Sequence, residues 1–318
     1  MNAGTLRNEL ATWYAKNARD LPWRRTRDPY AIWISEIMLQ QTRVAAAIPY
    51  YQRFLARFPN AESLAAAAET EVLTAWSGLG YYSRARNLHK AAKAIAERGA
   101  FPSDYESIRE LPGIGDYTAA AVASIAYGLP HAVVDGNVKR VIARLAGDGH
   151  ADAQEAATRL LDRKHPARSN QALMELGALI CLPRDPLCDS CPVAKHCEAR
   201  RLGMQAELPR RKPKPESQRV RLTLLAIRRR GKILLTPSPR VSGFWDLPEP
   251  FPGSRMGVEL GSFAHTIMNT RYACEVREAI ADRTPREARW WEEAKLHEIP
   301  LSTTAKKAIS VSSRHTPR

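Results

Sequence analysis

The chain has 318 residues, a formal net charge of +15 and 44% hydrophobic residues, which allows two domains of ordinary size and excludes a globally disordered chain. No apolar run approaches the ~20 residues of a membrane span, and the N-terminal segment lacks the apolar core of a secretion signal. The positive charge favours a polyanionic partner, although charge alone leaves both nucleic acid and an anionic membrane open.

The first predicted elements are helical. Residues 6–16 form an amphipathic pattern, and the following segment, 20–25, combines a proline with Trp23 and two arginines. The simplest interpretation of that segment is a surface loop that Trp23 anchors to the core. A single long helix is then predicted from Asp28 to Phe58, because apolar residues recur there at helical spacing.

Glu36 is the unusual residue of this long helix. Its neighbours are large and apolar: Trp33, Ile34, Ile37 and Met38. Burial in such a setting raises the pKa of a carboxyl group, and a carboxylic acid that is partly protonated near neutral pH can act as a general acid. The alternative is a surface glutamate at the helix edge.

A further helix is predicted over 61–75, followed by a glycine turn. Gly78 and Gly80 make this turn, which displays Leu79 and Tyr81. A displayed apolar and aromatic pair can wedge between the bases of DNA. The alternative is a helix-connecting loop whose side chains are buried.

The stretch 105–128 predicts two helices joined by a tight turn. Gly113 and Gly115 let the backbone bend, and Asp116 stands where the second helix begins. A hairpin of this kind directs free backbone N–H groups at an anion, typically a DNA phosphate. The alternative is a turn that only joins two helices.

Asp135 precedes a basic helix that begins at Gly136, and it is therefore a predicted N-cap. The helix dipole and the unpaired N–H groups stabilise a carboxylate at this position, so we expect Asp135 to stay ionised. A phosphate site and a fixed negative charge within one short stretch suggest chemistry on a nucleic acid that develops positive charge. Simple helix capping is the alternative.

Four of the five cysteines lie within 17 positions: Cys181, Cys188, Cys191 and Cys197. This crowding indicates metal binding in a reducing compartment rather than a disulfide framework. Zinc ribbons usually carry two C-x2-C pairs and this segment has one, so the irregular spacing favours a [4Fe–4S] cluster, with zinc as the alternative. We expect such a cluster to be structural, because no ligand position is left open.

The composition changes after the cysteines. Residues 204–219 form a basic, proline-containing linker, whose charges are either solvated or in contact with DNA. Residues 220–227 and 233–235 alternate in a way that predicts a β-hairpin, and 243–248 predict a loop with a strand. The fifth cysteine, Cys274, is expected to pack within a strand.

Three of these motifs together resemble the adenine DNA glycosylases (MutY family), within the helix-hairpin-helix superfamily of endonuclease III. They are the helical phrase SEIMLQQTRV at 35–44, the turn LPGIG at 111–115 and the cysteine spacing. The resemblance implies a mainly α glycosylase domain with an iron–sulfur cluster loop, followed by a smaller α+β Nudix-like domain. The implied boundaries are 1–203 for the helical domain, with helix-hairpin-helix at 105–128 and cluster loop at 181–197, then the linker 204–219 and the lesion-recognition domain 220–318.

The resemblance also assigns roles to single residues. Glu36 is the implied catalytic acid, and Asp135 the carboxylate that stabilises the sugar cation, with Tyr117 and Asn137 orienting them. Lyase members of the superfamily carry a nucleophilic lysine at the position of Tyr117, so plain hydrolysis of the base–sugar bond is implied here. The other implied roles fall to Trp23, Arg24 and Gln171 in the base pocket, to Gln41, Thr42, Leu79 and Tyr81 at the opposing base, and to Gly113 and Gly115 at a phosphate.

The C-terminal part resembles the Nudix-like domain of the same family, although the acidic Nudix pyrophosphatase motif is absent. We therefore expect a binding module. In the family a Phe-Ser-His loop recognises 8-oxoguanine, and the matching residues here are Phe263, Ala264 and His265. The serine hydroxyl is lost, which leaves backbone groups at Ala264.

The sequence thus predicts a monofunctional DNA N-glycosylase that removes adenine mispaired with 8-oxoguanine or guanine. Its expected partner is double-stranded DNA and no membrane, and we expect a monomer in the bacterial cytoplasm, associated with the nucleoid. One rival is a related glycosylase acting on thymine or an oxidised pyrimidine, against which Glu36 and the C-terminal domain argue. Another is a non-catalytic iron–sulfur protein that binds DNA.

Overall fold

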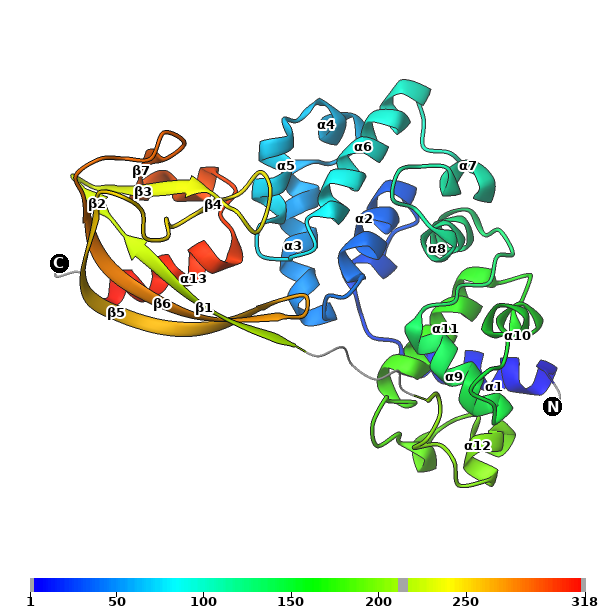
Figure 1. Cartoon of the computed structure of the whole chain (residues 1–318). Coiled ribbons are helices and arrows are strands. Elements are labelled where there is room, and N and C mark those ends of the chain that lie inside the picture. The colour runs from blue at the N-terminus through cyan, green and yellow to red at the C-terminus, as the bar shows by residue number, and fades with distance from the viewer. Residues whose placement is uncertain (1–2, 211–216, 316–318) are drawn as a thin grey trace. The chain divides into compact units, whose positions relative to one another are not determined.

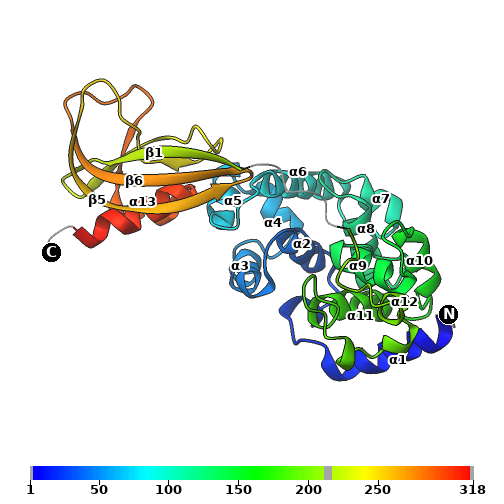
Figure 2. The same cartoon turned by 60° about the horizontal axis from the view of Figure 1, so that its bottom comes forward.

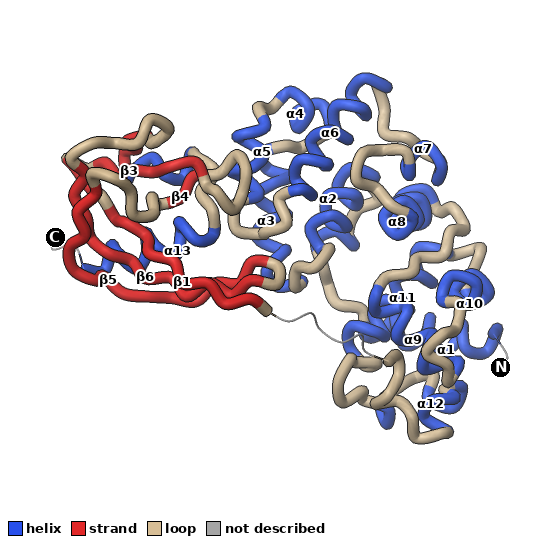
Figure 3. Tube along the Cα trace, in the orientation of Figure 1, coloured by secondary structure: helices blue, strands red, loops and turns tan. Residues whose placement is uncertain are grey.

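The computed structural model describes residues 3–210 and 217–315. The chain divides into two compact units, which are described separately below. The first unit comprises residues 1–65 and 90–212, and the second comprises 66–89 and 213–318. Figure 3 shows that the strands of the described residues all belong to the second unit.

The first unit is built from helices (Figure 1). They are α1 (Ala3–Asn17), α2 (Pro29–Leu39), α3 (Val44–Arg57), α4 (Ala61–Ala66), the end of α6 (Ser83–Arg98), α7 (Tyr105–Arg109), α8 (Asp116–Tyr127), α9 (Gly136–Ala146), α10 (Ala153–Leu160), α11 (Pro166–Leu179) and α12 (Glu198–Arg201). The predicted helix-hairpin-helix is α7, a turn and α8, and Gly128 ends α8 in the left-handed conformation (φ 70°). None of the described helices has the length and hydropathy that a membrane crossing requires.

The single helix predicted from Asp28 to Phe58 is wrong. Asp28 caps α2 through the N–H groups of Tyr30 and Ala31, but α2 ends at Leu39 and α3 begins only at Val44. Gln41 between them has a φ of 58°, and a left-handed residue cannot continue a right-handed helix. The helix predicted over 61–75 is likewise split, into α4 and α5 (Glu69–Trp76), and the Glu71 side chain accepts the N–H of Ala68 where α5 begins.

The second unit combines two sheets with helices. Its elements are α5, the start of α6, β1 (Gln218–Ala226), β2 (Arg228–Arg229), β3 (Lys232–Pro237), β4 (Trp245–Asp246), β5 (Ser254–Ile267), β6 (Thr270–Ala281), β7 (Arg289–Glu292) and α13 (Thr303–Ser312). One sheet has the order β1-β6-β5, with β1 parallel and β5 antiparallel to β6. Figure 2 shows α13 lying along this sheet, and β3 pairs with β2, β4 and β7 in the other. The predicted fold class, a helical helix-hairpin-helix part and an α+β part, is confirmed.

Two predictions for this region need correction. The hairpin of 220–227 with 233–235 is wrong for most of its length, because β1 pairs with β6 and only β2 pairs with β3. The segment 66–89 groups with the second unit rather than with the helical domain. There, the Ser77 hydroxyl donates to the carbonyl of Leu301 at 2.6 Å, and the rings of Tyr82 and Phe244 lie 4.0 Å apart.

The basic linker predicted at 204–219 is described only in part, since residues 211–216 lie outside the described residues. Gln218 and Arg219 already belong to β1. Cys274 lies in β6 and is 1% exposed, as predicted.

Candidate active site

A cavity of about 210 Å³ lies in the first unit between α2, α8, α9, α11 and the segment that precedes α2. Eight of the predicted site residues line it: Trp23, Arg24, Glu36, Thr42, Tyr117, Asp135, Asn137 and Gln171. Cavities for drug-sized ligands measure about 300–1,000 Å³, so this one suits a smaller group. The structure therefore gathers residues from five separate sequence segments around a space of limited size.

Glu36 lies on α2 and is 3% exposed. Burial, together with the nearby Asp135, raises the pKa of its carboxyl group to about 7, although Tyr117 and Arg24 act in the opposite direction. The Tyr117 hydroxyl donates a hydrogen bond to Oε2 of Glu36. Burial and the neighbouring carboxylates raise the pKa of Tyr117 itself well above its ordinary value. The carboxyl group is thus shifted toward its protonated form near neutral pH.

Asp135 is the N-cap of α9, as predicted. Its Oδ1 accepts the N–H of Val138 at 2.7 Å, and its Oδ2 accepts the Asn137 side-chain N–H at 2.9 Å. Hydrogen bonds of this kind stabilise the ionised form of a carboxyl group. One cavity therefore holds two carboxyl groups in opposite surroundings, Glu36 among apolar groups and Asp135 at a helix N-terminus.

A chain of hydrogen bonds connects Asp135 with the cysteine segment. Oδ1 of Asn137 accepts from Nη2 of Arg140 at 2.8 Å, and Nε of Arg140 donates to the carbonyl of Cys181 at 2.8 Å. Gly177 makes this approach possible, because a Cβ there would lie 2.7 Å from the Cβ of Asn137. The orientation of Asn137 thus depends on close packing between α9 and α11.

Glu175 and Arg19 also line the cavity, and neither was singled out from the sequence. The carboxylate of Glu175 is buried, and it accepts hydrogen bonds from Arg19 at 2.7 and 2.9 Å and from Arg24 at 2.8 and 3.0 Å. Burial raises the pKa of Glu175, but these bonds outweigh it and lower the pKa to about 2. A lone glutamate in the apolar stretch ALMELGALI was the signal that could have found it.

Glu175→Gln is expected to destabilise the first unit. A broken buried ion pair costs about 3–5 kcal/mol, and we expect the lower end of that range because Arg19 is one third exposed. Urea unfolding at pH 7 measures the loss. The matched control is Glu155→Gln, which removes an exposed pair with Arg159 and is expected to cost less than about 1 kcal/mol. Equal losses in the two variants would contradict a structural role for the Glu175 pair.

Tyr117→Phe removes a hydrogen bond that lowers the pKa of Glu36, so that pKa is expected to rise above about 7. If protonated Glu36 is the active form, the variant remains active at higher pH than the wild type. Single-turnover rates of base release measured across pH test this shift of the alkaline limb. Tyr105→Phe is the control, because the Tyr105 hydroxyl donates to the exposed Asp116 and Tyr105 does not line the cavity. An alkaline limb that does not move contradicts the role of Tyr117.

The hairpin turn has the geometry expected of a phosphate site. Gly113 has a φ of 77°, which favours glycine, and Gly115 is the N-cap of α8. A Cβ at Gly115 would meet no atom within 4 Å, so the space next to this N-terminus is open. Both glycines are exposed and accessible to a ligand.

The remaining predicted recognition residues lie at different places. In the second unit Leu79, Tyr81 and His265 line one cavity of about 560 Å³. Phe263, Ala264 and His265 are part of strand β5, so the prediction that these residues form a loop is wrong. The carbonyl of Ala264 accepts from Lys307 at 3.2 Å. Gln41, in the first unit, is exposed at the break between α2 and α3.

The four clustered cysteines lie close together in the loop that follows α11. Burial is the largest cause that raises the pKa of Cys191 to about 11, and Cys181, Cys197 and Cys188 contribute in the same direction, which places all four within electrostatic reach. The buried Arg144 donates to Sγ of Cys181 at 3.3 Å. No three His, Cys, Asp or Glu side chains of the described residues form a site for one metal ion.

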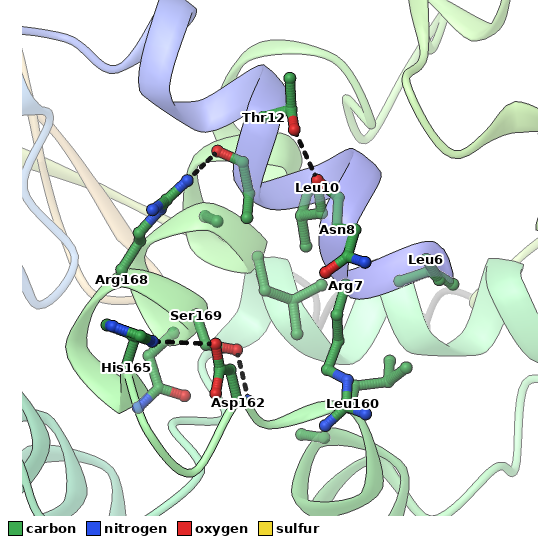
Figure 4. A pocket seen from close by; sticks show the side chains of 15 residues that line it. Leu6, Arg7, Asn8, Leu10, Thr12, Leu160, Asp162, His165, Arg168 and Ser169 are labelled. Atoms are coloured by element: carbon green, nitrogen blue, oxygen red, sulfur yellow. Dashed lines mark hydrogen bonds and ion pairs between the residues drawn. The ribbon is translucent and has the colours of Figure 1, made fainter. Parts of the chain in front are cut away.

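A further cavity of the first unit, about 310 Å³, lies between α1 and residues 157–173 (Figure 4). Its polar side chains bond within the unit: His165 pairs with Asp162 at 3.3 Å, and Arg168 donates to the carbonyl of Ala11 at 3.0 Å. None of the predicted site residues lines this cavity. It is therefore separate from the candidate active site.

Comparisons with known proteins agree with this fold. Residues 34–166 match the HhH-GPD superfamily of base excision DNA repair proteins. A solved thermostable thymine-DNA glycosylase is 31% identical, with a TM-score of 0.59 over 63% of this chain and 97% of that chain. The protein of an endonuclease III–DNA complex is 22% identical, with a TM-score of 0.57 over 64% of this chain and 99% of that chain. At this identity the similarity concerns the fold alone. The fold and the family match thus define a helix-hairpin-helix protein of the base excision repair class.

The similarity to curated proteins is more specific. The human adenine DNA glycosylase is 44% identical over 222 residues, which cover 64% of this chain and 40% of the human protein. That of Mycolicibacterium smegmatis is 44% identical over 209 residues, which cover 62% of this chain and 70% of the relative. The chain belongs to the adenine DNA glycosylase family. The match spans well under half the length of the mammalian relatives.

Proposed function

We propose that this protein is a mismatch DNA glycosylase that hydrolyses the N-glycosidic bond of adenine mispaired with 8-oxoguanine or guanine. The observation that supports it most is the pair of carboxyl groups, Glu36 and Asp135, lining one cavity in opposite surroundings. Family membership supports adenine as the base that is released, since the relatives are named adenine DNA glycosylases. Double-stranded DNA with the mispair is the proposed partner, and a monomer the proposed form, in the bacterial cytoplasm at the nucleoid.

The proposed reaction begins with the adenine extruded from the duplex, because its glycosidic bond cannot be reached in the stack. Glu36 donates a proton to the base, the bond between the sugar and the base breaks, and an oxocarbenium-like sugar forms. Asp135, already ionised, stabilises or briefly traps this cation, as paired carboxyl groups do in glycoside hydrolysis. Water adds to the sugar, with Glu36 now accepting the proton.

The roles of the surrounding residues follow from their contacts. Tyr117 and Asn137 orient the two carboxyl groups through the hydrogen bonds described above. Trp23, Arg24 and Gln171 border the space for the base. No lysine stands at the position of Tyr117, which supports hydrolysis without a Schiff base and hence no strand cleavage by the enzyme itself.

The base opposite the adenine is proposed to be read by Gln41, Thr42 and the second unit, which we interpret as a Nudix-like binding module. Leu79, Tyr81 and His265 share a cavity there, together with the N-terminal residues of α13. Burial and the neighbouring Lys307 lower the pKa of His265, which keeps its ring neutral near pH 7. Ala264 can offer only backbone groups. Gly113 and Gly115 would hold a phosphate of the strand.

The cysteine segment fits a [4Fe–4S] cluster, which Cys181, Cys188, Cys191 and Cys197 would hold. The four thiols lie within electrostatic reach of one another, but no group of three forms a site for a single metal ion among the described residues. A four-iron cluster has this property, because each cysteine binds a different iron and the ligands are therefore spread apart. The guanidinium of Arg144 on Sγ of Cys181 offsets the negative charge of such a group. When bound, the cluster would clip the loop to α9 and supply no hydrolytic chemistry.

Cys188→Ser is expected to lower the iron content and the broad visible absorbance of the purified protein. Cys274→Ser is the control, because Cys274 is buried in β6 of the second unit. Iron and sulfide analysis together with the absorption spectrum measure the difference. Zinc in place of iron, or unchanged iron in Cys188→Ser, contradicts the cluster assignment.

A base-release assay tests the proposed function. Duplexes carrying adenine opposite 8-oxoguanine are incubated with the protein, and half of each sample is then treated with alkali. Breaks at the adenine after alkali, and none before it, are expected. Breaks at thymine or an oxidised pyrimidine would instead indicate the related glycosylases, and intact strands a non-catalytic DNA-binding protein. Rates for adenine opposite 8-oxoguanine and opposite guanine then show how far recognition depends on the hydroxyl that Ala264 lacks.

A further inference from the structure

The β1-β6-β5 sheet of the second unit has two faces with different surroundings. Its inner face packs on α13 and is apolar, with Leu222, Leu224, Cys274 and Val276 in one core cluster. Half of its outer face is also covered, because Leu225 and Ala279 pack against Leu234 and Ala288. The other half of the outer face, at the start of β1 and β6, is exposed.

The strand register places three arginines on this open half. One row across β1, β6 and β5 consists of Arg219, Arg271 and Thr266. The next row consists of Arg221, Ala273 and Ala264. All six side chains are exposed. We call the surface of Arg219, Arg221, Arg271, Ala264, Thr266 and Ala273 the arginine face.

The charge of the arginine face is not balanced within the sheet. Neighbouring strands lie about 4.7–4.9 Å apart, so the side chains of Arg219 and Arg271 begin next to each other, and like charges in such positions destabilise a sheet. Within the described residues no side-chain hydrogen bond or ion pair is found for any of the three arginines, whose backbones pair in the sheet. The acid of the next row, Glu275, pairs with Arg277 at 2.7 Å.

The shape of the arginine face suits an extended polyanion. The side chains between the arginines are small, so an incoming chain can lie flat against the sheet. Arg219 and Arg221 are about 6.6 Å apart along the strand, comparable to the spacing of successive phosphates on one DNA strand. A guanidinium binds a phosphate through two parallel hydrogen bonds. In the sequence, the basic stretch 210–214 ends three residues before β1 begins.

We propose that the arginine face, which borders the residues proposed to read the opposing base, binds the sugar–phosphate backbone of DNA independently of base sequence. This surface adds a second phosphate contact to the one at the hairpin of α7 and α8. This proposal deepens the proposed function. It rests on that function for one point, namely that DNA is the partner. Its contribution is to affinity and salt dependence rather than to the chemical step.

The test compares two triple variants of the full chain. Arg219→Gln, Arg221→Gln and Arg271→Gln together remove the arginine face, and Arg229→Gln, Arg230→Gln and Arg283→Gln remove the same charge from exposed positions elsewhere in the second unit. Affinity for an undamaged, fully paired duplex is measured between about 50 and 200 mM salt. Each lost phosphate contact lowers the slope of log K against log salt by about 0.9, so we expect a decrease of about 2–3 and at least about 10-fold weaker binding at low salt.

The control triple is expected to change the slope by less than about 1. Equal changes in the two triple variants would mean that only the net charge matters, and this would overturn the proposal. Wild-type affinity in the arginine-face triple variant would overturn it as well. Loss of binding to phosphatidylserine vesicles with duplex affinity kept would assign the surface to a membrane instead. Removing mutually repelling charges also predicts a Tm at or above the wild-type value, and a lower Tm contradicts the unbalanced charge.

Adenine release separates this proposal from the proposed function. With protein in saturating excess, the arginine-face triple is expected to release adenine at the wild-type rate. A wild-type protein that binds duplex with the expected slope but releases no adenine would remove the proposed function and leave the arginine face standing. A triple variant that saturates the duplex but releases adenine more slowly would place these arginines in the chemical step, contrary to the proposal.

Discussion

Glu36→Gln is expected to lower the single-turnover rate of adenine release by about 10²–10⁴-fold, the usual contribution of a general acid. The amide has nearly the shape of the carboxyl group, and its oxygen can still accept the hydrogen bond of the Tyr117 hydroxyl. It cannot donate the proton that the departing base needs. Substrate affinity is expected to change little, so the loss falls on the chemical step. A variant that keeps the wild-type rate contradicts the assignment of Glu36 as the acid.

The same substitution is expected to change stability in a pH-dependent way. The pKa of Glu36 is about 7 in the folded chain and 4.5 without the protein environment. A carboxyl group with a raised folded pKa stabilises the fold fully below pH 4.5, and that stability is lost as the pH rises through 7. A pKa shift of this size corresponds to about 3 kcal/mol of unfolding free energy. The wild type loses this stability as the pH rises, whereas Glu36→Gln, which has no carboxyl group at this position, does not.

Urea unfolding of wild type and Glu36→Gln at pH 4.5 and pH 8 measures this difference. The gap in unfolding free energy, variant minus wild type, is expected to grow by about 3 kcal/mol between the two pH values. Glu62→Gln, at an exposed position of α4, is the control and is expected to show no such growth. A gap that stays constant with pH would mean that Glu36 is not held in an apolar site.

Asp135→Asn is expected to lower adenine release by about 10²–10³-fold, the cost of removing one preorganised electrostatic contact at a developing charge. Asparagine caps a helix about as well as aspartate, so α9 is expected to keep its N-terminus. The variant therefore separates the charge of Asp135 from its capping role. Asp152→Asn, at the N-cap of α10 and outside the cavity, is the matched control.

A second consequence of Asp135→Asn concerns pH. The negative charge of Asp135 raises the pKa of Glu36, so its removal lowers that pKa. Glu36 then deprotonates at lower pH, and the alkaline limb of the rate profile is expected to move down, opposite to the shift expected for Tyr117→Phe. A variant that loses activity without this shift would place the two carboxyl groups too far apart to interact. Full activity would reduce Asp135 to a helix cap.

The local features of this protein were predictable from the sequence because they depend on neighbouring residues. Asp135 was recognisable as an N-cap by its residue type and by the helix that follows it. The motif at 35–44 and the cysteine spacing indicated the family, which the comparisons show. These signals lie within short stretches, so no knowledge of distant contacts was needed.

The tertiary structure decided what depends on distant residues. Helix periodicity runs through Gln41 without a signal, and only the left-handed backbone there shows where α2 ends. Glu175 bonds Arg19 and Arg24 across 156 and 151 residues, so no local pattern announces that pair. The pKa of Glu36 likewise depends on burial by other helices and on Tyr117, 81 residues away. Residue types named the groups that could do the chemistry, whereas long-range packing set their partners, their burial and hence their charge.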